Sequence, residues 1–571
     1  MQGGDMALGL LQSALGHDRP APLVDLEHQG VGLGLREAEV RAEDPGHPRH
    51  EIHGIVPDHH VPRDLQGGAL GGVDLRALVQ IRSEAGQRRA GSRAELHDVP
   101  HRRHRSRQRV MTTMPGDRTA RRAASTVACV ESSNRTWSPA PTSLMTDHYE
   151  LTMLQAALRD GTAQRRSVFE VFSRRLPAGR RYGVVAGTGR FLEGLASFRF
   201  DEDRLAFLER TGVVDAATLE WLADFRFTGD ISGYAEGDLW FPHSPILRVE
   251  STFAEACILE TYLLSVLNYD SAVASAASRM ITAAGERPCL EMGSRRASEE
   301  SAVAAARAAV IAGFAGTSNL EAGYRYDLKT IGTSAHAFTL LHDDEEAAFR
   351  SQLETMGVGT TLLVDTYDVE KAVRLAVELA GPQLGAVRVD SGDLVDQAGR
   401  VRALLDSLGN RDTRITVTSD LDEYAIAALA AAPVDSYGVG TRLVTGSGAP
   451  TSSMVYKLVA REGADGQLVS VAKASSGKAS VGGRKSALRR LDPRGTATHE
   501  IVGVGHDPAD DGDDRPLMQD FVRGGELVDG WTGPQGVRRA RQRHADSVRE
   551  LPRSATRLSE GEAAIPTVLE N

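Results

Sequence analysis

Short apolar runs that end in polar residues recur through the middle of the chain, and each has a helical stretch behind it. The five runs cover residues 289–293, 361–365, 386–390, 415–419 and 436–440. Spacings of about 20 to 30 residues between later runs are typical of βα units in a parallel sheet or barrel. The pattern predicts an α/β fold in which the loops after the strands carry the chemistry.

The segments around these runs also carry periodic signals. Leu151, Leu154 and Leu158 have helical spacing, and residues 167–172 alternate like a strand before a basic turn. Residues 252–267 have a broad apolar face that predicts one helix. The stretch after Asp393 predicts a helix that ends before Gly409.

The first 140 residues differ from the rest of the chain. Ten of the 17 histidines lie before residue 105, among Gly, Pro and Arg and with little apolar periodicity. Such a segment cannot easily bury a core, so we expect a disordered extension. We also consider a natural translation start at Met111, Met114 or Met145.

Charge and composition exclude several classes of protein. The net charge of −11 disfavours a general nucleic-acid binder, and the basic run 101–105 has no aromatic residues interleaved. Three scattered cysteines fit neither a disulfide framework nor a zinc site. Residues 301–316 are apolar but too short to span a membrane, and no export signal is recognised. We expect a cytoplasmic protein without nucleic-acid or membrane partners.

The last section, from about residue 457, shows only weak strand alternation between Gly-rich and charged segments. The tail after about 535 is rich in Arg, Glu and Ser. It is predicted to form a surface helix or a loose end.

The segment 388–393 carries the sharpest candidate site. Asp390 and Asp393 at a strand end could hold ribose hydroxyls or a Mg²⁺ bound to pyrophosphate, and Arg388 adds a fixed cation. Asp and Gly are also common turn residues. Alone, the pattern fits an ordinary strand-to-helix turn equally well.

Small residues mark two further candidates. Gly438 and Gly440 would let backbone N–H groups approach a phosphate, and Thr441 offers a hydroxyl, although a simple tight turn is the commoner meaning. His336 follows the small residues 332–335 and could act as base or nucleophile. A lone histidine is more often structural, and His342 is a weaker rival.

Three other side chains suit an anionic aromatic ligand. Arg295 and Arg296 follow the run at 289–293 and could bind a carboxylate or phosphate in bidentate fashion, or form surface ion pairs instead. Tyr149, at a helix start, could be a core ring or a stacking surface.

Five segments in order resemble the nicotinate phosphoribosyltransferase family. They are Thr146–Met153, Phe169–Phe172, Glu291–Ala297, Gly332–His336 and Val389–Leu394. The resemblance runs from about residue 145 to about 490. It does not cover the first 140 residues, and the segment 482–485 only approximates the family's late Pro-Gly-Lys pattern.

The resemblance implies a two-domain type II phosphoribosyltransferase, usually dimeric, with the active site near the subunit interface. An irregular TIM-like α/β barrel over 256–456 would pair with a second α/β domain built from flanking segments 141–255 and 457–571. The reaction would join nicotinate to phosphoribosyl pyrophosphate, with Mg²⁺ and with ATP as co-substrate.

The same resemblance implies a role for each motif residue. Tyr149 would stack on nicotinate, Thr333 and Arg388 would line the substrate pocket, and Arg295 would help to bind the anionic substrates. His336 would be phosphorylated by ATP. Asp390 and Asp393 would face ribose or Mg²⁺. Gly438, Gly440 and Thr441 would hold the phosphoribosyl phosphate; the resemblance assigns no metal ligands.

Two other functions fit the same pattern. Nicotinamide or quinolinate phosphoribosyltransferase shares the architecture and differs in the base that it accepts. A non-catalytic nucleotide sensor would bind phosphoribosyl pyrophosphate without releasing pyrophosphate. A sensor derived from an enzyme would be expected to lose His336 or the pair Asp390 and Asp393, and all three are present.

Overall fold

The computed structural model of this chain describes residues 37–40, 52–55, 141–473 and 480–570. The chain divides into two units, residues 1–126 and 127–571. In the first unit, β1 (Glu37–Val40) pairs antiparallel with β2 (Ile52–Ile55). We predicted that the first 140 residues form a disordered extension and considered a later translation start. Apart from β1 and β2, these predictions fall on residues outside the described ones.

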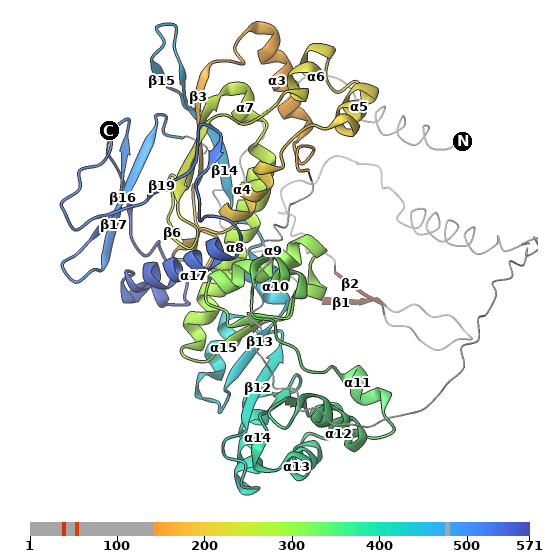
Figure 1. Cartoon of the computed structure of the whole chain (residues 1–571). Coiled ribbons are helices and arrows are strands. Elements are labelled where there is room, and N and C mark those ends of the chain that lie inside the picture. The colour runs from red at the N-terminus through yellow and green to blue at the C-terminus, as the bar shows by residue number, and fades with distance from the viewer. Residues whose placement is uncertain (1–36, 41–51, 56–140, 474–479, 571) are drawn as a thin grey trace, which may run out of the picture. The chain divides into compact units, whose positions relative to one another are not determined.

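A six-stranded parallel sheet forms the centre of the second unit (Figure 1). Its strands, in spatial order, are β10 (Thr361–Leu363), β11 (Ala386–Val389), β12 (Arg414–Ser419), β13 (Ser436–Val439), β8 (Cys289–Glu291) and β9 (Gly316–Thr317). All five predicted runs are confirmed as strands. The sixth strand, β9, has only two residues, which is too short to leave a periodic signal.

Helices follow the strands, as the βα pattern predicts. They are α9 (Glu299–Ile311), α10 (Leu320–Tyr326), α11 (His336–Leu341), α12 (Glu345–Met356), α13 (Val369–Ala380), α14 (Leu394–Ser407), α15 (Glu423–Ala428) and α16 (Thr441–Val444). The predicted helix after Asp393 is confirmed as α14. Gly409, just past its end, has the left-handed φ of 86° that a glycine accepts without strain.

The sheet is open between its two edge strands, because no ladder among the described residues joins β9 to β10. The segment from Thr330 to His336 crosses this gap. At one end, Thr330 bridges Thr317 of β9. At the other, the His336 ring is hydrogen-bonded to Thr366, just after β10. The resemblance implies a closed barrel. The structure has instead an open parallel sheet, with the loop from Thr330 to His336 crossing between its two edge strands.

A seven-stranded, largely antiparallel sheet draws on both ends of the second unit. Its order is β15 (Leu468–Ser470), β14 (Met454–Glu462), β3 (Arg166–Ser173), β7 (Leu247–Thr252), β5 (Asp230–Tyr234), β19 (Met518–Arg523) and β20 (Glu526–Leu527). The predicted strand at 167–172 is confirmed as β3. In the core beside this sheet the rings of Phe169 and Tyr456 stack with centroids 4.8 Å apart.

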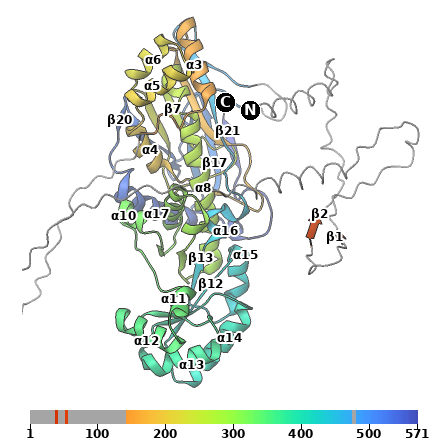
Figure 2. The same cartoon turned by 90° about the vertical axis from the view of Figure 1, so that its right-hand side faces the viewer.

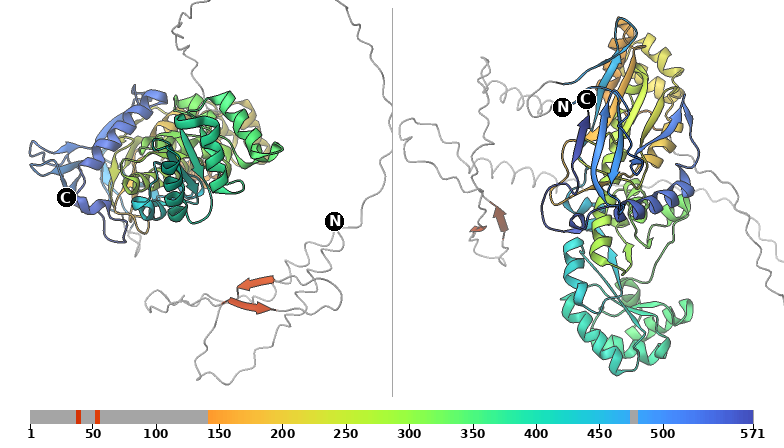
Figure 3. Two further views of the ribbon diagram at one scale, coloured as in Figure 1. Left: turned by 90° about the horizontal axis from the view of Figure 1, so that it is seen from below. Right: turned by 90° about the vertical axis from the view of Figure 1, so that its left-hand side faces the viewer.

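Smaller elements complete this end of the molecule (Figure 3). A four-stranded sheet has the order β18 (Arg515–Pro516), β16 (Lys485–Leu491), β17 (Ala497–Val504) and β21 (Thr567–Glu570). The pair β4 (Gly183–Val184) and β6 (Leu239–Trp240) and the helices α3 (His148–Asp160), α4 (Thr188–Ala196), α5 (Glu202–Thr211) and α6 (Ala216–Ala223) also belong here. The predicted helix through Leu151 and Leu154 is α3. None of the described helices is both long and apolar enough to cross a membrane.

The single helix predicted over 252–267 is wrong in its bounds, because the structure contains two helices. They are α7 (Phe253–Cys257) and α8 (Glu260–Ala284). The helical hydrogen bonds are interrupted by side chains from the segment around α3. Thr146 Oγ1 donates to the Ile258 carbonyl at 2.7 Å, and the Thr261 N–H donates to the Glu150 carboxylate at 3.0 Å. Apolar periodicity continues through the break and therefore conceals it.

The residues after about 535, predicted as a surface helix or a loose end, form regular secondary structure. Residues Gly533–Arg549 form α17, which buries Val537, Ala540, His544 and Ser547 on one face. The last strand, β21, pairs in parallel with β17. The predicted surface helix is thus confirmed, but the chain beyond it returns to a sheet. The exposed face of α17 is rich in arginine, and only a narrow stripe of the helix is buried, so composition alone does not reveal the buried face.

His544 supplies a test of how α17 is held. It is buried, with Nε2 2.9 Å from Ser278 Oγ, and burial together with Arg541 lowers the pKa of His544 to about 4. The unfolded chain gains a proton as pH falls below about 6.5, whereas the folded chain does not until about 4. We expect this histidine to cost up to about 3 kcal/mol of stability across that interval.

The measurement is denaturant unfolding at pH 7, 5.5 and 4. His544→Gln should lose less stability than the wild type as pH falls, because glutamine does not titrate. The control is His506→Gln, which changes an exposed histidine. Equal acid sensitivity in His544→Gln and the wild type would contradict the prediction.

Candidate functional site at the strand ends

Asp365 joins the carboxyl ends of β10 and β11. Its side chain is 2% exposed. Its Oδ2 accepts hydrogen bonds from the Asp390 N–H at 2.8 Å and from Ser391 Oγ at 2.7 Å. Its Oδ1 is buried without a hydrogen-bond partner among the described residues. A buried carboxylate is stable only when paired, so this oxygen marks a place where a cation or donor is expected.

Asp390 lies between three neighbours at the same edge. Thr418 Oγ1, at the end of β12, donates to Asp390 Oδ1. Asp390 Oδ2 lies 3.9 Å from both His336 Nε2 and Arg388 Nη2. The ends of β10, β11 and β12 are therefore connected through two carboxylates.

His336 stands at the start of α11, with one ring nitrogen hydrogen-bonded and the other near two carboxylates. Nδ1 is 3.1 Å from Thr366 Oγ1, and Nε2 is 3.8 Å from Asp365 Oδ1. The side chain is still 40% exposed, so a ligand can reach it. An imidazole between two carboxylates and open to solvent can accept a proton or a transferred group.

Arg388 fixes the crossing loop to β11. Its Nη1 donates to Thr333 Oγ1 and to the Ser334 carbonyl, both at 3.1 Å. Burial lowers the pKa of Arg388, the charges of Asp390 and Asp365 oppose this, and Arg295 lowers it further. Arg295 therefore lies near enough for its charge to act on Arg388. That arrangement suits an anion with a planar carboxylate.

Close packing requires a glycine at position 438, at the end of β13. A Cβ on Gly438 would lie 2.4 Å from Thr418 Cγ2 and 2.8 Å from Met292 Sδ. Gly440 lies beside Gly293, whose own Cβ would be 3.1 Å from the Gly440 carbonyl oxygen. The ends of β8 and β13 thus approach each other as backbones. Thr441 begins the one-turn helix α16 beside them.

Glu291 connects the ends of β8 and β9. It was not predicted as a site residue. It is buried, and it accepts hydrogen bonds from the Gly293 N–H and from Thr317 Oγ1 of β9. Burial raises the pKa of Glu291. Beside it, Ser294 Oγ accepts from Asn319 Nδ2 at 3.0 Å. These contacts set the position of Arg295 and Arg296 in the following short 3₁₀ turn.

Two predicted candidates have local structural roles. Asp393 Oδ1 caps α14 by accepting from the Val395 N–H at 3.1 Å and the Asp396 N–H at 3.2 Å. His342 Nδ1 is 2.8 Å from the Phe338 carbonyl oxygen of its own helical turn. The structure therefore favours His336 over His342 as the histidine of this site.

Tyr149 lies away from all of these residues within the chain. It stands in the first turn of α3, whereas His336 begins α11, and the two helices are at opposite ends of the second unit (Figures 1 and 2). Its surroundings are Glu260, Glu150 and Asp147. One chain alone does not bring Tyr149 to the strand ends.

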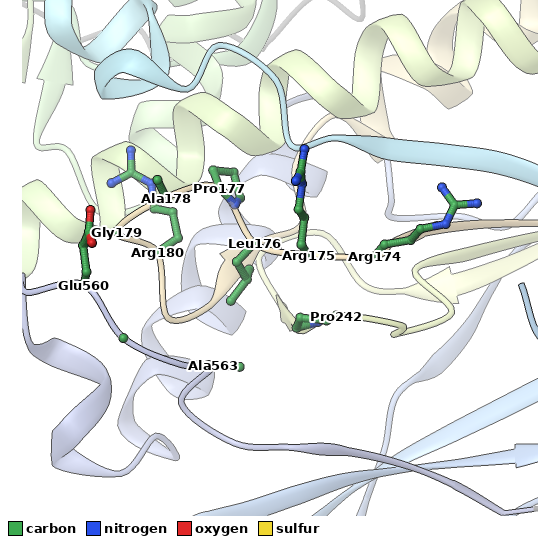
Figure 4. Close-up of a pocket in the computed structure, with 11 residues that line it drawn as sticks. Arg174, Arg175, Leu176, Pro177, Ala178, Gly179, Arg180, Pro242, Glu560 and Ala563 are labelled. Atoms are coloured by element: carbon green, nitrogen blue, oxygen red, sulfur yellow. The ribbon is translucent and has the colours of Figure 1, made fainter. Parts of the chain in front are cut away.

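A separate cavity of about 380 Å³ lies between the basic turn 174–180 and the segment 560–563 (Figure 4). Arg180 of this turn is buried and donates to Glu423 Oε1 at 2.6 Å, and Arg279 donates to the same oxygen at 3.0 Å. None of the cavity's lining residues is one of the strand-end residues. Arg180 here ties the turn to α15.

The sequence places Asp365 among the polar residues of the loops after the strands, without a role, and leaves Thr366, Thr418 and Glu291 outside the predicted site. Asp365 and Thr418 do lie at the ends of predicted strands, which is the available signal. Their partners lie between 25 and 30 residues away. Only the order of strands in space brings them together.

The family models and the relatives found by sequence agree on one family. The family model described as the nicotinate phosphoribosyltransferase N-terminal domain matches residues 144–268, and that of the nicotinate phosphoribosyltransferase family matches residues 288–489. The chain is 56% identical over 436 residues to nicotinate phosphoribosyltransferase pncB1 of Mycobacterium tuberculosis, covering 75% of this chain and 95% of that protein.

Two further similarities are more distant. The nicotinate phosphoribosyltransferase of Bacillus subtilis is 39% identical over 362 residues, covering 61% of this chain and 73% of that protein. The crystal structure of human nicotinic acid phosphoribosyltransferase matches with a TM-score of 0.63 at 25% identity, covering 74% of this chain and 97% of that one.

Proposed function

We propose a reaction from one premise: the chain belongs to the nicotinate phosphoribosyltransferase family. It joins nicotinate to the ribose 5-phosphate of phosphoribosyl pyrophosphate and releases pyrophosphate. The observation that carries this proposal is the cluster at the strand ends, where His336 lies within 4 Å of Asp365 and Asp390 and Arg388 holds the loop before it.

Charge at the site supports nicotinate as the base. Arg388 lies among the strand-end residues, the charge of Arg295 acts on it, and a guanidinium pairs with a carboxylate through two parallel hydrogen bonds. Nicotinate carries that carboxylate and nicotinamide does not. The pyridine nitrogen then attacks C1 of the ribose while the C1–O bond to pyrophosphate breaks, so positive charge develops on the sugar. Asp390 is the carboxylate that faces this charge.

The ribose 5-phosphate is assigned to the end of β13. Gly438 and Gly440 let the backbone at the end of β13 approach Met292 and Gly293, and Thr441 offers a hydroxyl beside them. Asp393 is left with its second oxygen for a ribose hydroxyl, because the first caps α14. We also propose that the sheet is the wall of an irregular barrel over 256–456, completed by the crossing loop and flanked by a domain from 141–255 and 457–571.

Mg²⁺ fits the donor set of this site. The buried Asp365 Oδ1 lacks a partner, and Asp390 Oδ2 faces the same space. Mg²⁺ takes one or two carboxylates and fills its other positions with water and substrate phosphates. When bound there, it would neutralise charge on the leaving pyrophosphate.

His336 is assigned as the residue that couples ATP to the reaction. The imidazole takes the γ-phosphoryl group as the bond to ADP breaks, and water later cleaves the N–P bond to release phosphate. Thr366 and Asp365 orient the ring for this transfer. The energy released favours nicotinate mononucleotide.

The complete site is assigned to a homodimer. Tyr149 is 46% exposed at the far end of the chain from His336, and Met145 and Met153 are exposed beside it. Around His336, Leu340 and Leu341 are exposed, the latter 77%. Two such apolar surfaces, one at each end of a chain, can be covered reciprocally in a symmetric pair. Tyr149 of one copy then stacks on the nicotinate of the other.

The activity is tested by pyrophosphate release from phosphoribosyl pyrophosphate and Mg²⁺ with nicotinate, nicotinamide or quinolinate. We expect release with nicotinate and a higher yield of product with ATP. His336→Ala should lose the ATP effect, because no residue then accepts the phosphoryl group. His342→Ala is the matched control and should keep it. Release with another base would reassign the substrate, and binding without release would identify a sensor.

Subunit mixing tests the homodimer. Tyr149→Ala and Arg388→Ala should each be nearly inactive, and co-expression should restore about a quarter of wild-type activity, because mixed dimers contain one intact site. The control pairs Tyr149→Ala with the Tyr149→Ala/Arg388→Ala double variant, which leaves no intact site. A co-expressed pair no more active than its separate members would contradict a shared site.

A further inference from the structure

The edge strand β10 has backbone groups on its outer side that no neighbouring strand uses. The Thr360 carbonyl accepts from the Ala386 N–H of β11 at 3.2 Å. The Val364 N–H donates to the Arg388 carbonyl of β11 at 3.1 Å. Alternate residues of a parallel strand direct their backbone groups to the same neighbour, so residues 360 and 364 face β11. Thr361 therefore directs its carbonyl the other way, to the edge where no ladder among the described residues joins β10 to β9.

Gln352 of α12 supplies the missing partner at this edge. Its Nε2 donates to the Thr361 carbonyl at 3.0 Å, and its Oε1 accepts from Ser334 Oγ of the crossing loop at 2.8 Å. The residue is buried, with 5% of its surface exposed, and Nε2 also donates to Thr360 Oγ1 at 3.3 Å. A primary amide offers the same donor and acceptor as a peptide group. Gln352 therefore joins β10 to the crossing loop where a regular barrel would have a backbone ladder.

Ser334 is held from two sides. Its hydroxyl donates to Gln352, and its carbonyl accepts from Arg388 Nη1 at 3.1 Å. The same Nη1 donates to Thr333 Oγ1 at 3.1 Å. A continuous line of hydrogen bonds thus runs from the buried face of α12 through the crossing loop to β11. We call Gln352, Ser334 and Arg388 the loop clamp.

The loop clamp leaves part of the Arg388 guanidinium for a ligand. Nη1 is used by the crossing loop. Nε is buried without a hydrogen-bond partner among the described residues, and Nη2 lies 3.9 Å from Asp390 Oδ2, beyond hydrogen-bond distance. Buried N–H groups of a cation are stable only when an acceptor meets them, so an anionic ligand is expected beside them. The direction of these groups depends on where Nη1 is held.

We propose that Gln352 is a positioning residue for recognition of the base. Through Ser334 it holds the crossing loop against β10, and so it fixes the Arg388 guanidinium in the direction that meets the carboxylate of nicotinate. This inference rests on the proposed function. Gln352 acts through Ser334 and is not a catalytic residue. A loop without this anchor has more conformations to lose when nicotinate binds, and the affinity falls.

The test is steady-state kinetics of the wild type, Ser334→Ala, Ser334→Thr, Gln352→Met and the Ser334→Ala/Gln352→Met double variant, with both substrates varied at a fixed ATP concentration. We expect the KM for nicotinate to rise about fivefold in Ser334→Ala, the effect of one hydrogen bond, and at least as much in Gln352→Met. The KM for phosphoribosyl pyrophosphate should be unchanged. Ser334→Thr restores a hydroxyl and should recover most of the affinity that alanine loses. The double variant should be no worse than Gln352→Met, because both changes remove the same contact.

A purely structural role of the loop clamp would give a different result. When part of a population is unfolded, kcat falls in proportion, whereas the folded fraction keeps both KM values. Hydrogen exchange of the peptide that covers residues 330–336 is a second readout. It should be faster in Ser334→Ala than in the wild type, while the central strands keep their protection.

Two exposed residues serve as matched controls. Thr355→Ala removes a hydroxyl of α12 that donates to the Ser351 carbonyl of the same helix. Gln542→Met removes an amide of α17 that donates to Asp546. Both variants should match the wild type in both KM values and in the exchange of residues 330–336.

The outcomes separate the inference from the proposed function. An unchanged KM for nicotinate in Ser334→Ala and Gln352→Met, or effects that multiply in the double variant, would overturn the role of Gln352. If Gln352→Met does not fold, the comparison of Ser334→Ala with Ser334→Thr still decides. A wild type that releases no pyrophosphate with nicotinate would overturn the proposed function and the role in base recognition, and hydrogen exchange would then show whether the clamp still holds the loop.

Discussion

The buried carboxylate of Asp365 is the contact on which the site depends. It receives the backbone N–H of Asp390 and the hydroxyl of Ser391, and so fixes the turn after β11 against the end of β10. Asp390 is then aligned with Thr418 on one side and with His336 on the other. Without this carboxylate the turn after β11 would lose its two hydrogen bonds to the end of β10, and Asp390, which faces His336, would lose the anchor of its backbone N–H.

The crossing loop gives this arrangement its histidine. A regular barrel would close β9 on β10 by a ladder of backbone hydrogen bonds. Here the segment from Thr330 to His336 fills the gap, tied to β9 by Thr330, to β11 by Arg388 and to Thr366 by the imidazole. The irregularity of the sheet is thus what places a reactive imidazole beside two carboxylates.

Much of this could be predicted from the sequence, since it depends on local pattern. The five apolar runs are strands, and Arg388, Asp390 and His336 do meet at their ends. The rest depends on spatial order. Asp365 and Thr418 have partners from other βα units, β9 is too short for a periodic signal, and the break before α8 is made by Glu150 from a distant helix. No pattern within one segment carries that information.

Each end of the second unit lacks a kind of side chain that the other end holds. The strand ends of the parallel sheet hold arginines, carboxylates and a histidine. Among the described residues that contact one another there, none is an aromatic ring on which a pyridine could stack. The antiparallel end holds an exposed Tyr149, and the charged groups that act on it, Glu260, Glu150 and Asp147, are all acids. In the proposed homodimer, each chain would supply to the other's site the group that a single chain lacks.

The most direct test is a crystal structure of the protein with nicotinate mononucleotide bound. The account predicts the pyridine ring between Tyr149 of one copy and Arg388 of the other, with the phosphate at Gly440 and Thr441. A ring bound in one isolated chain, with Tyr149 in solvent or far from both copies' strand ends, would contradict it.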